Sequence, residues 1–192
     1  MKTLITLVLM ALLVGSGLSM ALDKGDTAPE IRARKWLNTP GSVTLKGLTG
    51  TVVVVEFWAT WCPPCRASIP HLIKLNKKYK DQGVVIIGLT NEDYSKAKIA
   101  KFVKDMKMDY IVGTASDTGK SYGVTGIPAA FIVGKNGKIV WSGHPMDGLD
   151  KALEAALAPA DEHKDAPPKK PGSATLPPPP APPSAKPGSR PR

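Results

Sequence analysis

Apolar runs alternate along the chain with polar stretches of helical periodicity, a pattern that predicts an α/β domain. The strongest strand signal covers residues 51–58, where four consecutive valines from Val52 indicate a central strand covered on both faces. A second buried strand is predicted over 84–90. Shorter strands are predicted over 31–36, 42–45, 110–112, 129–133 and 138–142, the last two forming a hairpin.

Three helices are predicted from apolar positions that recur every three or four residues, over 63–80, 95–107 and 149–157. Leu72, Leu75 and Tyr79 mark the first of them, and Gly83 follows its end. The resulting order of elements is β-α-β-α-β-β-α, which is an α/β pattern, and no internal repeat is visible.

Residues 1–21 are typical of an export signal. Lys2 precedes an apolar run from Leu4 to Val14, and small residues before Ala21 offer a cleavage site. An uncleaved anchor is the alternative, because no charge separates Lys2 from Asp23. Both interpretations place the remaining chain outside the cytoplasm, and we expect a periplasmic protein whose signal is cleaved after Ala21.

The other end of the chain is rich in proline: residues 159–192 hold 12 of the 19 prolines. Such a segment cannot bury a core and favours extended polyproline II, so we predict a disordered tail and a folded domain over 22–158. The tail is interpreted either as a dispensable end or as a basic spacer that makes weak contact with the cell-envelope surface.

The net charge of +10 is not concentrated in one patch. Lys2 and the tail carry part of it, and the lysines of the domain alternate with acidic residues, as over 96–109. This distribution argues against nucleic-acid binding and indicates a mildly basic solvated surface.

Candidate chemistry lies at one turn. The only cysteines, Cys62 and Cys65, rule out a scaffold of several disulfides and a four-thiolate zinc site. A buried strand ends and a helix begins there, so unpaired N–H groups and the helix dipole favour the reactive thiolate of Cys62. Pro63 and Pro64 are tolerated because first-turn N–H groups lack helical partners. A structural disulfide or half a zinc site is the alternative. A zinc site would need more ligands, and the only nearby histidine is His71, two turns into the predicted helix.

The segment from Phe57 to Cys65, Phe-Trp-Ala-Thr-Trp-Cys-Pro-Pro-Cys, resembles the active site of the thioredoxin superfamily, and of its exported TlpA-like branch in particular. Pro70 lies where thioredoxins carry a helix-kinking proline, and residues 123–128 resemble the family's cis-proline loop. The resemblance covers about 26–158. It implies a thioredoxin-like fold, with a central mixed sheet flanked by helices and an N-terminal extension of short strands.

Several residue roles are implied by this resemblance. Cys62 is expected to attack a substrate disulfide, and Cys65 to resolve the mixed disulfide. Pro128 is expected to be cis and to place the backbone of Ile127 beside the sulfurs, while Trp61 shapes the contact surface. The redox-active pair then needs no external cofactor and no metal.

Two acidic residues are candidates for proton transfer. Glu56 interrupts the apolar strand two residues before Trp58, where classical thioredoxins carry a buried aspartate. A buried carboxyl has a raised pKa and can exchange a proton with the resolving thiol; the alternative is a glutamate that points outwards. Glu92, after the strand at 84–90, is a second candidate, unless Glu92 and Asp93 belong to a solvated loop that caps the next helix.

The function implied is an exported thiol–disulfide oxidoreductase that reduces envelope proteins, possible clients including apocytochrome c. A membrane electron donor would reduce it again. Ala59 argues against a peroxidase, because peroxiredoxins carry threonine three residues before their reactive cysteine. A disulfide-forming oxidase remains an alternative, as does a non-catalytic binding module with a structural disulfide.

Overall fold

The computed structural model describes residues 22–158, so the signal peptide predicted at 1–21 and the tail predicted at 159–192 lie outside the described residues. No helix within 22–158 is both long enough and apolar enough to cross a membrane. The strands are β1 Lys35–Leu37, β2 Val52–Phe57, β3 Val84–Leu89, β4 Ile111–Thr114, β5 Ala129–Val133 and β6 Ile139–Gly143. The helices are α2 Pro63–Tyr79, α3 Ile99–Asp105, α4 Thr118–Ser121 and α5 Leu149–Leu157, with 3-10 turns at Lys46–Leu48 and Lys80–Gln82.

The strands form one mixed sheet in the order β1-β4-β3-β2-β5-β6. Strands β4, β3 and β2 are parallel neighbours, whereas β5 pairs antiparallel with β2. The short edge strands β1 and β6 are also antiparallel to their neighbours. Strand β2 lies inside the sheet and every one of its residues is buried, as its valine run predicted.

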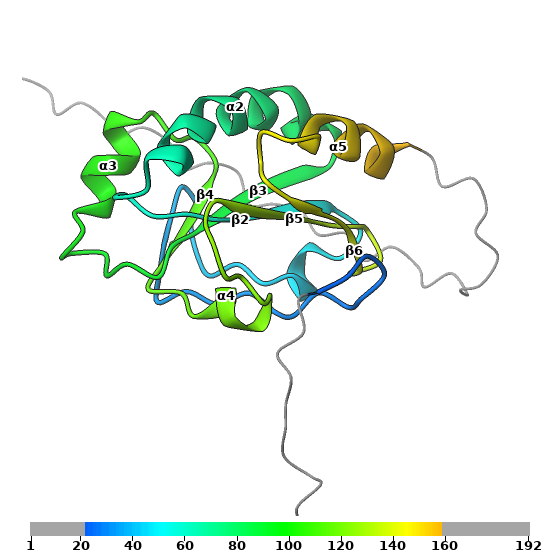
Figure 1. Ribbon diagram of the computed structural model, residues 1–192, viewed down its shortest axis with the longest axis horizontal. Coiled ribbons are helices and arrows are strands. Elements are labelled where there is room, and N and C mark those ends of the chain that lie inside the picture. The colour runs from blue at the N-terminus through cyan, green and yellow to red at the C-terminus, as the bar shows by residue number, and fades with distance from the viewer. Residues whose placement is uncertain (1–21, 159–192) are drawn as a thin grey trace, which may run out of the picture.

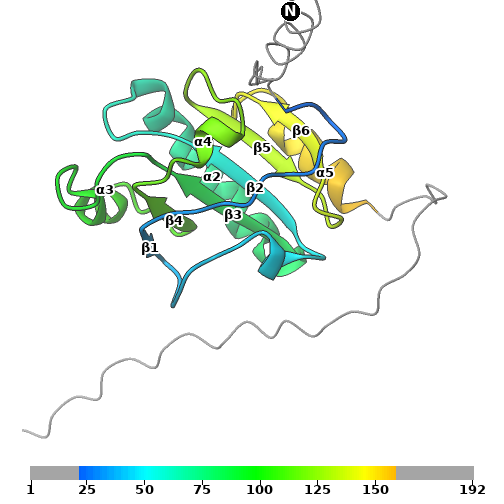
Figure 2. The ribbon, with the colours of Figure 1, turned by 90° about the horizontal axis from the view of Figure 1, so that it is seen from below.

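Alternate side chains of β2 point to two separate cores. Val52, Val54 and Trp58 belong to the cluster beneath α2, α3 and α5, which lie on one side of the sheet in Figure 1. Val53 and Phe57 belong to the other cluster. Helix α4 and the segment that leads into β1 cross that second face, as Figure 2 shows. The central mixed sheet flanked by helices confirms the predicted fold class.

The predicted N-terminal strands are only partly right. The strand expected over 31–36 is reduced to β1, and Ile31 is buried in the second core outside any strand. The strand expected over 42–45 is absent among the described residues. There the carboxylate of Glu30 accepts hydrogen bonds from the backbone N–H groups of Leu45 and Lys46, and a 3-10 turn follows.

The helix predicted over 95–107 is shorter than expected. It begins at Ile99, because Lys98 has a left-handed backbone with φ of 50° that interrupts the helical path. The carboxylate of Asp93 accepts bonds from the N–H groups of Ser95 and Lys96, which organises the turn before it. Helix α4 is too short to leave a periodic signal in the sequence and was not predicted.

Candidate active site

The two cysteines lie at the junction between β2 and α2. The backbone N–H of Trp58 still bonds to the carbonyl of Leu89, after which the chain leaves the sheet. Cys62 is the N-cap of α2, and Pro63 and Pro64 occupy its first two positions. Proline fits there because first-turn N–H groups have no partner within the helix.

Cys62 and Cys65 form a disulfide, with 5.3 Å between their Cα atoms. The Sγ atom of Cys62 accepts a hydrogen bond of 3.2 Å from the backbone N–H of Cys65. The same N–H donor and the positive end of the α2 dipole would stabilise a thiolate on Cys62 after reduction. The arrangement therefore favours thiolate chemistry at Cys62 over Cys65.

The two sulfur atoms are buried next to an exposed rim, which is formed by Trp61, Pro63 and Pro64. Cys65 is fully buried and Cys62 is 3% exposed in this oxidised state, whereas Trp61 is 69% exposed. Pro63 and Pro64 are exposed as well. Of the two sulfur-bearing residues, only Cys62 keeps any exposed surface, next to the exposed Trp61 and Pro63.

That neighbouring loop carries Ile127 and Pro128. The peptide bond between them is cis, and the carbonyl oxygen of Ile127 lies 3.8 Å from Sγ of Cys62. A pocket of about 490 Å³ opens next to the turn and is lined by Trp61 and Ile127. Leu89, Val124 and residues of α4 also line it. This pocket could not be predicted from the sequence, because α4 leaves no periodic signal there.

Glu56 is fully buried, and neither of its carboxylate oxygens has a hydrogen-bond partner in the described residues. It lies on the same face of β2 as Val54 and Trp58, which is the face that α2 and both cysteines cover. Burial raises the pKa of Glu56 to about 8. The interpretation as an outward-pointing glutamate is therefore wrong, because this position lies in the centre of the sheet.

Glu92 makes direct contact with the turn that carries the cysteines. One of its carboxylate oxygens accepts a bond of 2.6 Å from the backbone N–H of Thr60, and the other accepts a bond of 2.6 Å from the Thr60 hydroxyl. The hydroxyl of Thr90 donates to the same carboxylate at 3.1 Å. With both oxygens engaged, Glu92 fixes the turn that leads to Trp61. Asp93, not Glu92, caps the following turn.

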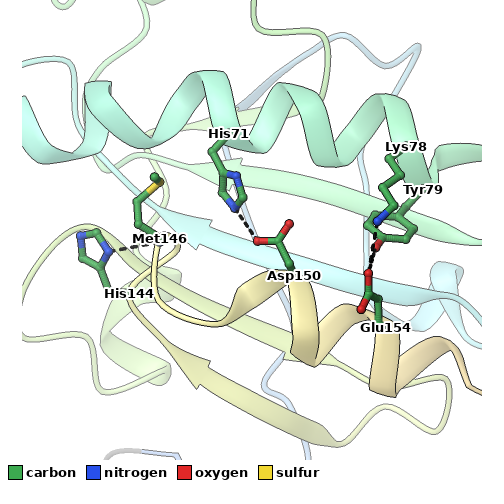
Figure 3. A network of polar contacts seen from close by, with 7 residues as sticks. All are labelled: His71, Lys78, Tyr79, His144, Met146, Asp150 and Glu154. Carbon is green, nitrogen blue, oxygen red and sulfur yellow. Dashed lines mark hydrogen bonds and ion pairs between the residues drawn. The ribbon is translucent and has the colours of Figure 1, made fainter.

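The histidine considered as a metal ligand lies elsewhere. Nε2 of His71 is 3.0 Å from a carboxylate oxygen of Asp150, which links α2 to α5 (Figure 3). A second link joins these helices where Glu154 accepts bonds from Lys78 and Tyr79. Within residues 22–158, no group of three acidic, histidine or cysteine side chains is placed to hold a metal ion.

Comparisons with known proteins agree with this geometry. The Redoxin family model matches residues 23–157. The thiol-disulfide oxidoreductase ResA of Bacillus thuringiensis subsp. konkukian is 36% identical over 100 residues, which cover 51% of this chain and 57% of that protein. The match thus spans little more than half of the relative.

Solved structures show the same fold. The thioredoxin domain of the thiol-disulfide oxidoreductase BVU-2223 from Bacteroides vulgatus superposes with a TM-score of 0.65 at 28% identity, over 71% of this chain and 99% of that domain. A thiol:disulfide interchange protein from Bacteroides sp. superposes with a TM-score of 0.62 at 30% identity, over 74% of this chain and 95% of its own. The predicted thioredoxin-like fold is confirmed.

Proposed function

This chain belongs to the Redoxin family of thioredoxin-like proteins, and on that premise we propose that it is an exported thiol–disulfide oxidoreductase that reduces disulfides of envelope proteins. One observation carries the proposal. Cys62 is the N-cap of α2, its sulfur accepts the Cys65 N–H, and its disulfide partner is fully buried. This asymmetry gives one cysteine the attacking role and the other the resolving role.

The reaction has two exchange steps. The Cys62 thiolate attacks a client disulfide, forms a mixed disulfide and releases one client sulfur as a thiolate, which takes up a proton from water. Cys65 then loses its proton, and its thiolate attacks Sγ of Cys62. The protein disulfide forms and the second client sulfur leaves as a thiolate. Two electrons have passed from the protein to the client.

Glu56 is the group proposed to exchange the proton of Cys65. It lies on the sheet face that α2 covers and has no competing partner in the described residues. Its pKa of about 8 places both protonation states within reach at neutral pH. When ionised it accepts the Cys65 proton, and when protonated it returns the proton as the disulfide is reduced.

The client is proposed to bind across the rim between Trp61 and the Ile127 loop. A backbone carbonyl close to Cys62 can pair with an extended client segment, while the 490 Å³ pocket accepts an apolar side chain beside the client cysteine. Proteins with exposed disulfides in extended segments, such as apocytochrome c, fit this description.

Export and the direction of electron flow are further parts of the proposal. The apolar segment at 1–21 supports export to the periplasm. In that oxidising compartment a reductase needs a membrane donor of electrons to restore the dithiol. The proline-rich segment at 159–192 is proposed to contact the envelope surface only weakly.

The decisive experiment compares the full chain with Cys62→Ser and Cys65→Ser in dithiothreitol-dependent insulin reduction. We expect both variants to lose turnover, and only Cys65→Ser to accumulate mixed disulfides with clients. Turnover that survives Cys62→Ser would show that the disulfide is structural.

The reduction potential of the Cys62–Cys65 pair decides the direction of electron flow. A low potential supports a reductase, and a high potential supports an oxidase.

A further inference from the structure

The strand beside Glu56 carries a glycine in an otherwise bulky row. Strand β3 turns Val84 and Ile86 towards the core beneath α2, and Gly88 is the next residue on that face. Gly88 pairs in register with Glu56 of β2, and cross-strand neighbours share a face of the sheet. A glycine inside a strand weakens it and often marks a place that another group approaches closely. Glu56 thus lies beside a position that has no side chain.

The backbone conformation of Gly88 does not require a glycine, because its φ lies outside the left-handed region. Its surroundings do. A Cβ atom at this position would lie 2.9 Å from Nε1 of Trp58, 3.1 Å from Cε2 of Tyr110 and 3.3 Å from Oε2 of Glu56. Carbon atoms in van der Waals contact are about 3.5–4.0 Å apart, so these separations are too short. The three side chains already occupy the space that a methyl group would need.

Of these three groups, the Glu56 carboxyl is the one that bears on the chemistry. It is fully buried, has no hydrogen-bond partner in the described residues, and belongs to the sheet face that α2 and both cysteines cover. A carboxyl group can pack in such a place only where its neighbours leave room for it. Its register partner on the other side, Ala130 of β5, is also small.

We propose that Gly88 is a positioning residue for Glu56, because its missing side chain lets the carboxyl group pack over the backbone of β3, beneath α2 and away from solvent. A methyl group at position 88 would push the carboxyl group and the rings of Trp58 and Tyr110 apart, and this loosening would admit solvent. The consequence for turnover rests on the proposed proton exchange between Glu56 and Cys65, whereas the placement of the carboxyl group does not.

No charged side chain near Glu56 competes with this explanation. Burial is what raises its pKa, and none of the charged residues of α2, α3 and α5 is buried. Strands β3 and β5 carry no titratable residue. The titratable groups that reach this core are Tyr79 of α2 and Tyr110, which precedes β4. Burial, with a contribution from the charge of Glu56, raises the pKa of Tyr110 well above its usual value, so this ring stays neutral while Glu56 titrates.

The main test is Gly88→Ala in the full chain. We expect the midpoint of the Glu56 titration, about pH 8 in the wild type, to fall by about one pH unit, because solvent at the carboxylate lowers the cost of its charge. The C=O stretch of the protonated carboxyl group, assigned by its loss in Glu56→Gln, reports this midpoint by infrared spectroscopy of the oxidised protein. An unchanged or raised midpoint would overturn the proposal.

Gly113→Ala is the matched control. Gly113 also lies in a strand with an ordinary backbone, and a Cβ atom there would lie 2.7 Å from Cδ2 of Leu89 and 2.8 Å from Cβ of Ala33. The crowding is at least as severe, but Leu89 belongs to the second core, on the opposite face of the sheet. Gly113→Ala should therefore lower the urea midpoint of unfolding and leave the Glu56 titration midpoint unchanged. Equal shifts of the titration midpoint in both variants would overturn the proposal, because general loosening of the sheet would then be their cause.

A double variant keeps the proposal testable if Gly88→Ala does not fold. Glu56→Ala removes the carboxyl group from the crowded space, so Gly88→Ala should lower the urea midpoint less in that background than in the wild type, or should fold only there. Equal losses in the two backgrounds, or failure to fold in both, would show that Gly88 makes room only for the rings of Trp58 and Tyr110. Either result would overturn the proposal.

The pH profile of insulin reduction separates this proposal from the proposed function. If Glu56 exchanges the proton of Cys65, the profile of Gly88→Ala should shift to lower pH together with the infrared midpoint. An infrared midpoint that shifts without any change in the profile would contradict the proton exchange, while it would still support the placement of the carboxyl group by Gly88.

Discussion

Two glutamates lie beside the same turn, and their surroundings differ in every respect that matters for a carboxyl group. Glu56 is fully buried in the sheet and bonds to no other residue of the described chain. Glu92 follows the next strand, is only partly buried, and receives three hydrogen bonds from Thr60 and Thr90. The Glu56 carboxyl is buried without a hydrogen-bond donor among the described residues, whereas the Glu92 carboxyl receives several donors.

This difference suits the two carboxyl groups to two different roles, proton exchange and the fixing of a turn. An isolated buried carboxyl prefers its neutral form, so it binds a proton at a pH where ordinary glutamates have lost theirs. A carboxylate that receives several strong bonds holds its donors in place instead. Glu56 is thus suited to exchange a proton, whereas Glu92 is suited to hold the turn that leads to Cys62.

The largest effect should come from removing the charge of Glu56. Its pKa is about 8 in the folded protein against an ordinary value of 4.5, so the folded state keeps a proton that the unfolded chain releases. Stability is therefore complete below about pH 4.5 and falls as pH rises towards 8, in total by on the order of 5 kcal/mol. Urea unfolding at pH 5 and pH 9 should show this fall in the wild type and not in Glu56→Gln.

The control for that experiment is Glu92→Gln, which keeps Glu56 and should therefore keep the fall. If the free energy of unfolding changed with pH by the same amount in the wild type and in Glu56→Gln between pH 5 and pH 9, Glu56 would not have a raised pKa in the folded protein.

Glu92→Ala should have the next largest effect. It leaves the N–H and the hydroxyl of Thr60 without their acceptor, which costs about 2–3 kcal/mol for bonds to a charged group. Urea unfolding at pH 7 measures the loss. We also expect slower insulin reduction, because the turn before Cys62 is no longer fixed. Wild-type stability in Glu92→Ala would show that the contact with Thr60 is incidental.

Thr60→Val should have a smaller effect, on the order of 1 kcal/mol, because it removes only the hydroxyl bond and keeps the backbone bond to Glu92. Thr60→Ser is the matched control, since it retains the hydroxyl and should unfold close to the wild-type urea midpoint. If Thr60→Ser were as unstable as Thr60→Val, lost packing of the methyl group would be the cause.

The smallest effect should follow Asp93→Asn. The backbone N–H groups of Lys96 and Ser95 lower the pKa of this exposed carboxyl below 3.8. Its contribution is therefore present above that value and is lost as pH falls through the lowered pKa. Thermal unfolding at pH 6 and pH 3 should show a slightly larger drop in Tm for the wild type than for Asp93→Asn. Identical drops would mean that the bonds to Ser95 and Lys96 add nothing.

The local features of the fold were predictable because their signals are local. The four valines of β2, the periodic residues of α2 and the hairpin glycines mark their elements within a few positions. Helix α5 begins and ends at the predicted residues. The N-terminal segment was not predictable in the same way: Ile31 is buried by the fold without a strand around it, and Glu30 bonds to a turn 15 residues away.

In the candidate site, too, the features that depend on adjacent residues were predictable and those that depend on distant contacts were not. The placement of Cys62 and Cys65 at a strand–helix junction follows from adjacent residues, and so does the presence of an acid in the buried strand. The bonds between Glu92 and Thr60 join residues 32 positions apart and depend on how the loop after β3 meets the turn after β2. No sequence pattern near Thr60 predicts these hydrogen bonds.

The sequence alone determined the location of the reactive cysteines, because the signals for the strand, the turn and the start of the helix all lie in neighbouring residues. The tertiary structure alone decided what each glutamate can do. Register places Gly88 rather than a larger residue beside Glu56 and leaves that carboxyl unpaired, and loop packing brings two donors of Thr60 to Glu92. A carboxyl group's proton affinity depends on its nearest dipoles and on water, and both are set by residues distant along the chain.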